Sequence, residues 1–306
     1  MEKKKYIILA LIIIGLVLIS GCAKKSTAET APSGAFIGGT NGLVMSFVAD
    51  APPSEYPQGV PFDIIVNVEN KGEYTVPTDQ AVMVIGGIPY VDNKTQKLDE
   101  LTGRQLLQKT ATPGGVLQVQ FSSDGSPTFP GSQPQKITAS LCYAYVTQIQ
   151  GTVCVKESLA KQTVGGAELC TITGDKTVYS SGAPIKITSL TESATSQAGK
   201  VIGLRFTMFV KDEGPGVSYL GETCPPNLAD ANKVKVTSAK LVSLGIDLDC
   251  KKAVDGVLIT GDKGGIITCV TPEGANIEGE FEDVLLMELS YGYTQSITKS
   301  ITFTTV

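Results

Sequence analysis

The chain has 306 residues, a formal net charge of −5 at pH 7 and an isoelectric point near 5.0. This acidic balance offers no basic surface to a nucleic acid, so we expect no nucleic-acid partner. The sequence lacks histidine, which excludes Ser-His-Asp and Cys-His catalytic sites and every histidine-ligated metal centre. It also lacks tryptophan, which excludes the Cys…Trp…Cys core of antibody domains.

The N-terminus has the three-part order of a secretory signal. Lys3–Lys5 precede an uncharged apolar run over residues 6–19, and Ser20-Gly21 leads to Cys22. This cysteine resembles that of a bacterial or archaeal lipoprotein lipobox, in which the cysteine becomes the first mature residue and carries the lipid. The resemblance implies a signal peptide over residues 1–22, lipidation at Cys22 and an anchor on the outer face of the cell membrane.

Two other interpretations of this segment remain open. Tyr6 to Ala23 is an unbroken run without charge and is just long enough to cross a bilayer as an uncleaved helix. A type IV pilin-like leader is the third, although such leaders are usually cut before the apolar run, and only lysine and tyrosine flank that position here. The lipobox and the helix both place residues 23–306 outside the cytoplasm.

A linker and two repeated domains are expected after the signal. Residues 23–43 are small, polar and glycine-rich, which is typical of a flexible linker. We predict one domain over residues 44–160 and a second over residues 165–306, joined near Ala160–Gly166 as two separate folding units.

Three short matches in the same order support the repeat. Gln58–Ile64 parallels Ser181–Ile187, and Gly114–Gln118 parallels Gly264–Thr268. The clearest match is between Leu141–Tyr145 and Leu289–Tyr293, at an offset of 148 residues.

Alternation of apolar and polar residues predicts β-strands in both repeats. Every second residue from Ile137 to Tyr145 and from Leu285 to Tyr293 is apolar or aromatic, and we expect these faces, including the tyrosines, to be buried. Further strands are predicted at Phe62–Val68, Ala81–Ile85, Val116–Phe121, Leu204–Val210 and Val234–Leu241. Lys94–Lys109 is expected to be a short helix or an irregular insertion. The predicted fold class is all-β, with two tandem β-sandwiches.

The segment Phe62–Gly72 resembles the strand and turn of CARDB-like and related immunoglobulin-like modules of archaeal and bacterial surface proteins. Phe206–Gly216 carries an echo of the same pattern. The resemblance implies two immunoglobulin-like domains outside the cell, with a role in adhesion or display. It brings no catalytic residue.

The seven cysteines divide into Cys22 and six others, which is consistent with three disulfides in an oxidising compartment. Cys142 and Cys154 lie symmetrically about Gln148, so we predict that they face each other in a hairpin and form a disulfide.

The remaining four cysteines allow three connectivities. We favour Cys250–Cys269 with Cys170–Cys224. A four-cysteine zinc site is the alternative, but the spacings contain no C-x₂-C pair. We expect no metal and no cofactor.

Two further kinds of segment resemble known modification or metal sites. Asn93-Lys94-Thr95 is an N-glycosylation sequon between predicted strands. Acidic segments around Asp247, Asp255, Asp262 and Glu278–Asp283 do not match a calcium-binding loop, and ordinary turns explain them better.

These observations favour a non-enzymatic, membrane-anchored surface lipoprotein for adhesion, display or interaction with envelope proteins. The alternative is an accessory or solute-capturing lipoprotein of a transport or secretion system, which would need a deep cleft. A hydrolase using paired carboxylates is the third hypothesis, and no acid/base motif supports it. The sequence does not identify the envelope protein or glycan partner.

Overall fold

The computed structural model describes residues 35–108, 110–159, 168–221, 224, 228–250, 253, 255–259 and 263–305. The predicted signal with Cys22, most of the linker and the Ala160–Gly166 join lie outside these residues. In the part of the chain that is described, no helix has the length and apolar composition needed to cross a membrane.

The described fold is all-β, as predicted, with one short 3₁₀ turn at Leu228–Asp230 (η1). Each strand predicted from alternation is present. The strands are β1 (Leu43–Phe47), β2 (Glu55–Pro57), β3 (Phe62–Asn70), β4 (Ala81–Gly86), β5 (Thr95–Lys97), β6 (Gln105–Leu107), β7 (Thr110–Thr112), β8 (Val116–Ser123), β9 (Gln133–Lys156), β10 (Gly174–Lys176), β11 (Val178–Ser180), β12 (Ile185–Gln197), β13 (Lys200–Asp212), β14 (Val217–Tyr219), β15 (Lys233–Leu241), β16 (Ile246–Asp247), β17 (Val257–Leu258), β18 (Gly265–Val270) and β19 (Glu280–Thr304).

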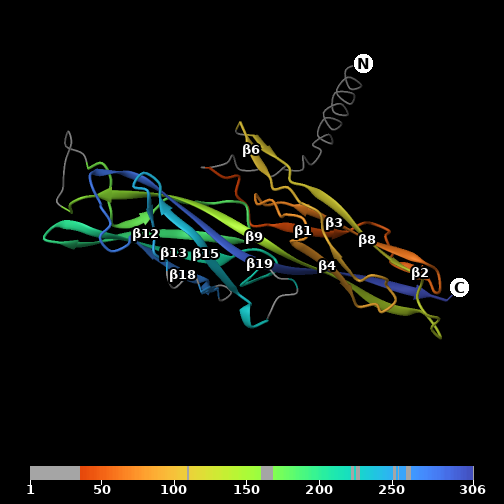
Figure 1. Ribbon diagram of the computed structural model, residues 1–306. Helices are drawn as coiled ribbons and strands as arrows, with labels where there is room; N and C mark the ends of the chain where they lie inside the picture. Colours follow the sequence, from red (N-terminus) through yellow and green to blue (C-terminus); the bar gives the residue numbers. More distant parts are fainter. Residues whose placement is uncertain are drawn as a thin grey trace, which may run out of the picture. The chain divides into compact units, whose positions relative to one another are not determined.

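Two very long strands lie side by side at the centre (Figure 1). β9 has 24 residues and β19 has 25, and they pair antiparallel without a register shift from Glu280↔Lys156 to Phe303↔Gln133. At about 3.4 Å per residue the ladder is roughly 80 Å long, several times the length of an average strand. Ten strands form the shared sheet built on this ladder, with the central order β16-β15-β19-β9-β4-β5.

The strands before and after Lys156 repeat one topology, which we call the first half (β1–β9) and the second half (β10–β19). The first half has a smaller sheet of order β1-β3-β8, and the second has β12-β13-β18 with β10 added at its edge. In the shared sheet, β4 and β5 flank β9 as β15 and β16 flank β19. Each smaller sheet faces the shared sheet, so both halves are β-sandwich-like.

Each long strand serves both halves. The N-terminal part of β9 pairs with β4 of its own half, from Ala81↔Tyr143 to Gly86↔Thr138, and its C-terminal part pairs with β11 of the second half. β19 does the same in the opposite sense: its N-terminal part pairs with β15 of its own half, and its C-terminal end pairs with β2 of the first half. The two halves therefore exchange strand segments within one chain, as domain-swapped dimers do between chains.

A single core runs through both halves, and residues 32–306 cluster as one unit. The faces predicted to be buried are buried: odd-numbered residues from Ile137 to Tyr145 and from Leu285 to Tyr293 are at most 1% exposed. The same alternation continues through Thr147, Ile149 and Val153, which are also buried. The inward face of β9 is therefore unbroken along its length.

Several details of the sequence interpretation need correction. Gln58–Ile64 leads into β3, whereas Ser181–Ile187 leads into β12, which is the topological counterpart of β1. Both segments are turns before a half-buried strand. This shared local structure explains why their sequences are similar although the strands that follow are not topologically equivalent. The other two matches do fall on equivalent strands, β8 with β18 and β9 with β19. The described residues of Lys94–Lys109 form β5, β6 and irregular connections, with no helix among them.

The C-terminal end of the predicted linker is part of the folded unit. The carboxylate of Glu73 accepts hydrogen bonds from the backbone N–H groups of Ile37 and Gly38, at 2.9 Å each, and from that of Gly182 in the second half. Leu43 is already in β1 and is 1% exposed. The Glu73 carboxylate of the first half therefore satisfies backbone donors from two other segments, the N-terminal segment and the turn at Gly182 of the second half.

The strand exchange predicts how fragments behave. Because each half lacks a strand segment that the other supplies, residues 44–160 and 165–306 expressed separately should not unfold cooperatively as monomers. Co-expression should restore a one-to-one complex with cooperative unfolding. Size-exclusion chromatography and chemical denaturation measure both properties. A cooperatively folded monomer from either fragment alone would show that the exchanged segments are dispensable.

Candidate functional site

Four tyrosines occupy the point where the halves meet. Tyr143 is paired with Tyr293 and Tyr145 with Tyr291 across the ladder, and ring centroids of neighbours lie 5.7–6.4 Å apart. Burial raises the pKa of the Tyr143 and Tyr291 hydroxyls well above the usual value. These side chains are therefore core residues, as predicted, rather than a surface that stacks on a ligand.

The tyrosine hydroxyls tie separate segments together. Tyr145 donates to Asn70 Oδ1 at 3.2 Å, Tyr293 donates to Asp212 Oδ1 at 3.0 Å, and the Tyr291 hydroxyl lies 2.8 Å from Thr147 Oγ1. Neutral hydroxyl groups that are buried and hydrogen-bonded in this way make a core more rigid, and they are not available to react with a substrate.

All six cysteines expected in disulfides are bonded, in the pairs Cys142–Cys224, Cys154–Cys170 and Cys250–Cys269. The expected pairing of Cys250 with Cys269 is present. Disulfide formation by all four later cysteines leaves them unable to hold zinc. Three disulfides indicate folding in an oxidising compartment.

The predicted Cys142–Cys154 and Cys170–Cys224 pairings are wrong. The hairpin about Gln148 does not exist, because β9 continues through that position as one strand. Twelve residues along a strand separate Cys142 from Cys154 by about 40 Å, far beyond disulfide reach. Cys142 instead bonds Cys224 of the second half, and Cys154 bonds Cys170.

Tyr219 packs over the Cys142–Cys224 bond. Its hydroxyl lies 2.8 Å from Cys142 Sγ and 3.5 Å from Cys224 Sγ, and it is the donor because disulfide sulfur carries no hydrogen. The ring lies against Gly292, where an added Cβ would come within 2.0 Å of it. Gly292 therefore has to be glycine for this disulfide to be covered.

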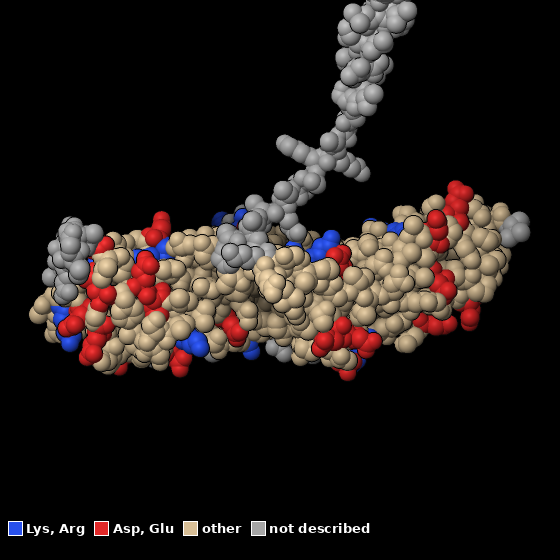
Figure 2. All heavy atoms as spheres, turned by 90° about the horizontal axis from the view of Figure 1, so that it is seen from above, with Lys and Arg blue, Asp and Glu red and all other residues tan. Residues whose placement is uncertain are grey.

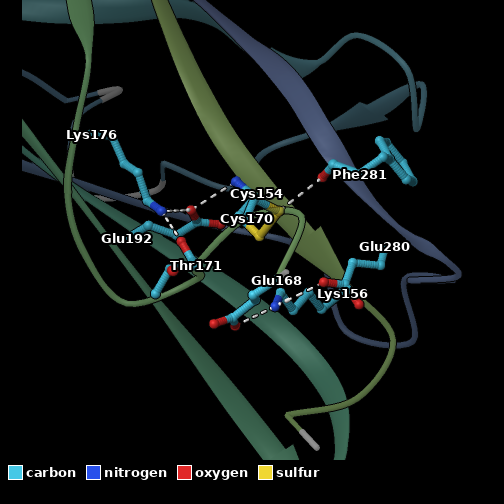
Figure 3. Close-up of a disulfide and its surroundings, with 9 residues drawn as sticks. All are labelled: Cys154, Lys156, Glu168, Cys170, Thr171, Lys176, Glu192, Glu280 and Phe281. Carbon is cyan, nitrogen blue, oxygen red and sulfur yellow. Dashed lines mark hydrogen bonds and ion pairs between the residues drawn. A yellow bond between two sulfur atoms is a disulfide. The ribbon is translucent and has the colours of Figure 1, made fainter. Parts of the chain in front are cut away.

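A buried lysine lies beside the Cys154–Cys170 disulfide (Figure 3). Lys156 Nζ contacts Glu168 at 2.5 Å and its cross-strand partner Glu280 at 3.0 Å, and its side chain is 5% exposed. Desolvation lowers the lysine pKa, but the hydrogen bonds and charges of the two carboxylates outweigh it, and the pKa is raised. A lysine held protonated in this way is a structural cation and not a nucleophile.

A second ion pair lies on the other side of the same disulfide (Figure 3). Glu192 Oε2 accepts from Cys154 N at 2.9 Å and lies 3.0 Å from Lys176 Nζ, while Lys176 also donates to Thr171 O. Glu192 Oε1 has no hydrogen-bond partner among the described residues. Burial raises the pKa of Glu192 to about 7 against the attraction of Lys176.

The other predicted site residues have clear places. Asn93 has φ of 42°, a conformation that asparagine tolerates, and Asn93, Lys94 and Thr95 are all exposed, so the sequon is accessible. Asp283 is buried and accepts from the backbone of Ser243, Leu244 and Val284, which is the ordinary role of an acidic residue at a turn. No cluster of metal-ligating side chains occurs within the described ranges.

A groove of about 570 Å³ crosses the outer face of the shared sheet, and sequence reasoning missed it. Its floor comes from β9, β15, β16 and β19, and Ala35 and Phe36 line one side. Gln148, Ser238, Lys240 and Asp247 are exposed there. Each of these side chains points outward from its strand. The order of the strands in the sheet brings them together, and the sequence alone does not reveal that order.

Charge is spread unevenly over the surface. Figure 2 shows acidic side chains in separate groups on one face of the molecule, with largely uncharged surface between them. Among the described residues of this face (Figure 2), no single charged patch is large enough to steer a strongly charged partner.

No known family model matches the chain, and no curated protein shows significant similarity to it.

The disulfides should contribute unequally to stability. Replacing both Cys142 and Cys224 with serine opens a link spanning 82 residues and should lower the free energy of unfolding by about 4.5 kcal/mol, against about 3 kcal/mol for Cys154 and Cys170, which span 16. Urea denaturation of the two double variants measures the difference. Equal losses, or non-reducing peptide maps with other pairings, would contradict this assignment.

Glu192 should make stability depend on pH. Its pKa is higher in the folded protein than the ordinary 4.5, so the folded state holds a proton that the unfolded chain has released. The free energy of unfolding should therefore fall as pH rises from about 4.5 to about 7, and Glu192→Gln should remove the part of that fall that Glu192 causes.

Denaturation at a series of pH values measures this effect. Glu282→Gln, which alters an exposed carboxylate on β19, is the matched control and should keep the wild-type slope. A Glu192→Gln variant with an unchanged slope would show that Glu192 stays ionised in the folded protein.

Proposed function

We propose that the protein is a non-catalytic, membrane-anchored extracytoplasmic lipoprotein that displays its joined immunoglobulin-like β-sandwich halves for adhesion or for interaction with envelope proteins or glycans. The observation that carries the proposal is the set of three disulfides, two of which tie β9 of the long β9–β19 ladder to the connections around it. Disulfides of this density belong to oxidising compartments. The lipobox resemblance at Cys22 supplies the anchor.

The internal groups also support a display role. Most polar groups of the buried carboxylates, lysines and tyrosines described above have partners within the fold, with Glu192 Oε1 and the Tyr143 hydroxyl as exceptions among the described residues. The groove on the shared sheet lies over a sheet face and is lined mostly by exposed and half-buried side chains, so it is shallow. A shallow face suits contact with an extended partner better than enclosure of a small solute, which places the solute-capturing alternative second.

Membrane fractionation tests the anchor. Cys22→Ser should release the protein from the membrane or leave an unprocessed precursor, because the acyl chains are then missing. Ser26→Ala, four residues further on, is the matched control and should remain attached and processed. The helical anchor would be established instead if the Cys22→Ser variant stayed attached to the membrane and both the variant and the wild type began at Met1.

A further inference from the structure

The floor of the outer-face groove is built from two cross-strand rows of side chains. In the first row Asp247 is opposite Lys240, Lys240 is opposite Leu286, and Leu286 is opposite Gln150. The second row runs from Ser238 to Glu288 to Gln148. Residues of the two rows are two positions apart on each strand, so both rows point out of the same face.

The second row has its hydrogen-bonding groups already arranged. Glu288 accepts from Gln148 Nε2 at 3.3 Å and from Ser238 Oγ at 3.4 Å. In the first row, the side chains of Gln150 and Lys240 make no hydrogen bond to another described residue. The groove therefore presents amide, carboxylate, hydroxyl and ammonium groups in one plane, with donors and acceptors still available to a ligand.

The backbone beneath the groove is closed to a peptide strand. β15 and β9 pair with β19 on its two sides, and β15 pairs with β16 on the other side. Since β9 also pairs with β11 on its other side, a ligand over the middle of the floor cannot pair as a strand with β9, β15 or β19, and there it has to be recognised through side chains. That requirement favours a molecule that carries many hydroxyl groups of its own.

The charge of the groove and the side chains at its edge further restrict the class of ligand that it can bind. One lysine and two carboxylates line it, a net formal charge of −1, so it disfavours a polyanion and is too weakly charged to hold a polycation. Phe36 is half-buried at its edge, and Leu286 is half-buried in its floor. An aromatic ring and an aliphatic side chain beside polar groups match the apolar C–H faces and the hydroxyl rim of a sugar ring.

We infer that the groove formed by Phe36, Gln148, Gln150, Lys240, Leu286 and Glu288 binds a neutral oligosaccharide. The inference rests on the proposed display function, for which it supplies a ligand class. The volume of about 570 Å³ falls in the range of small-ligand sites and accommodates a short stretch of a longer glycan.

Binding of the full chain in detergent micelles tests the inference. The chain is first applied to a printed array of neutral and acidic oligosaccharides, and the best neutral hit is then titrated by calorimetry. We expect a neutral hit with Kd between roughly 10 μM and 1 mM, as befits a shallow site. Gln148→Ala combined with Gln150→Ala should weaken it at least about tenfold, and Glu288→Gln should weaken it as well, because the acceptor for Gln148 and Ser238 loses its charge.

Thr298→Ala is the matched control, because Thr298 is exposed on the outer face of β19 outside the groove, and it should bind like wild type. Absence of any neutral hit, a preference for acidic glycans, or equal loss in Thr298→Ala would overturn the inference. Binding that appears only after residues 23–34 are deleted would assign the groove to the chain's own linker and would overturn it too. Loss of sugar binding while attachment still depends on Cys22 would leave the proposed function standing.

Discussion

The β9–β19 ladder is the interaction on which the rest of the structure depends. Twenty-four residue pairs in one register hold the odd-numbered residues of both strands on the core side. A slip by one residue would turn every one of these side chains to the solvent, so the hydrophobic pattern fixes the register along the whole ladder. The smaller sheets, the central tyrosines and two of the three disulfides are all positioned by attachment to these strands.

The repeat and the ladder have a common centre. The offset of 148 residues takes Ala144 to Gly292, and these two residues are also paired with each other across the ladder. Rotation about this pair exchanges the two Tyr-x-Tyr motifs, which is why four tyrosines meet at one place. When the last strand of each copy of a duplicated sandwich stays extended instead of folding back, that one strand contributes to the sheets of both copies.

The sequence predicted the strands and their buried faces well, because alternation reports directly on which side of a sheet is covered. It did not predict the continuity of β9. The signal was present: Thr147, Ile149 and Val153 keep the alternation, and the stretch from Val146 to Thr152 contains no Asn-Gly, Asp-Gly or proline turn. Symmetry of Cys142 and Cys154 about Gln148 was weaker information than this uninterrupted pattern.

Cysteine partners and the outer-face groove could not be obtained from the chain in the same way. Cys224 and Cys170 lie in connections whose course depends on tertiary packing, and no local rule orders six cysteines into pairs. The groove residues come from β9, β19 and the consecutive strands β15 and β16, which are three segments distant from one another in sequence. The equivalence of β3 with β13 likewise follows from sheet order and leaves only the weak trace between Phe62–Gly72 and Phe206–Gly216.

The docking of Ile37, Gly38 and Gly182 on Glu73 has a mechanical consequence. Tension applied through the N-terminal segment reaches the folded unit where the two halves join, and one carboxylate receives it together with the backbone of both. The load is therefore shared between the turns at Glu73 and Gly182 before it reaches β1. Under tension, a protein tethered in this way would first lose the hydrogen bonds of Ile37 and Gly38 to Glu73, which frees a few residues, while the β9–β19 ladder stays intact.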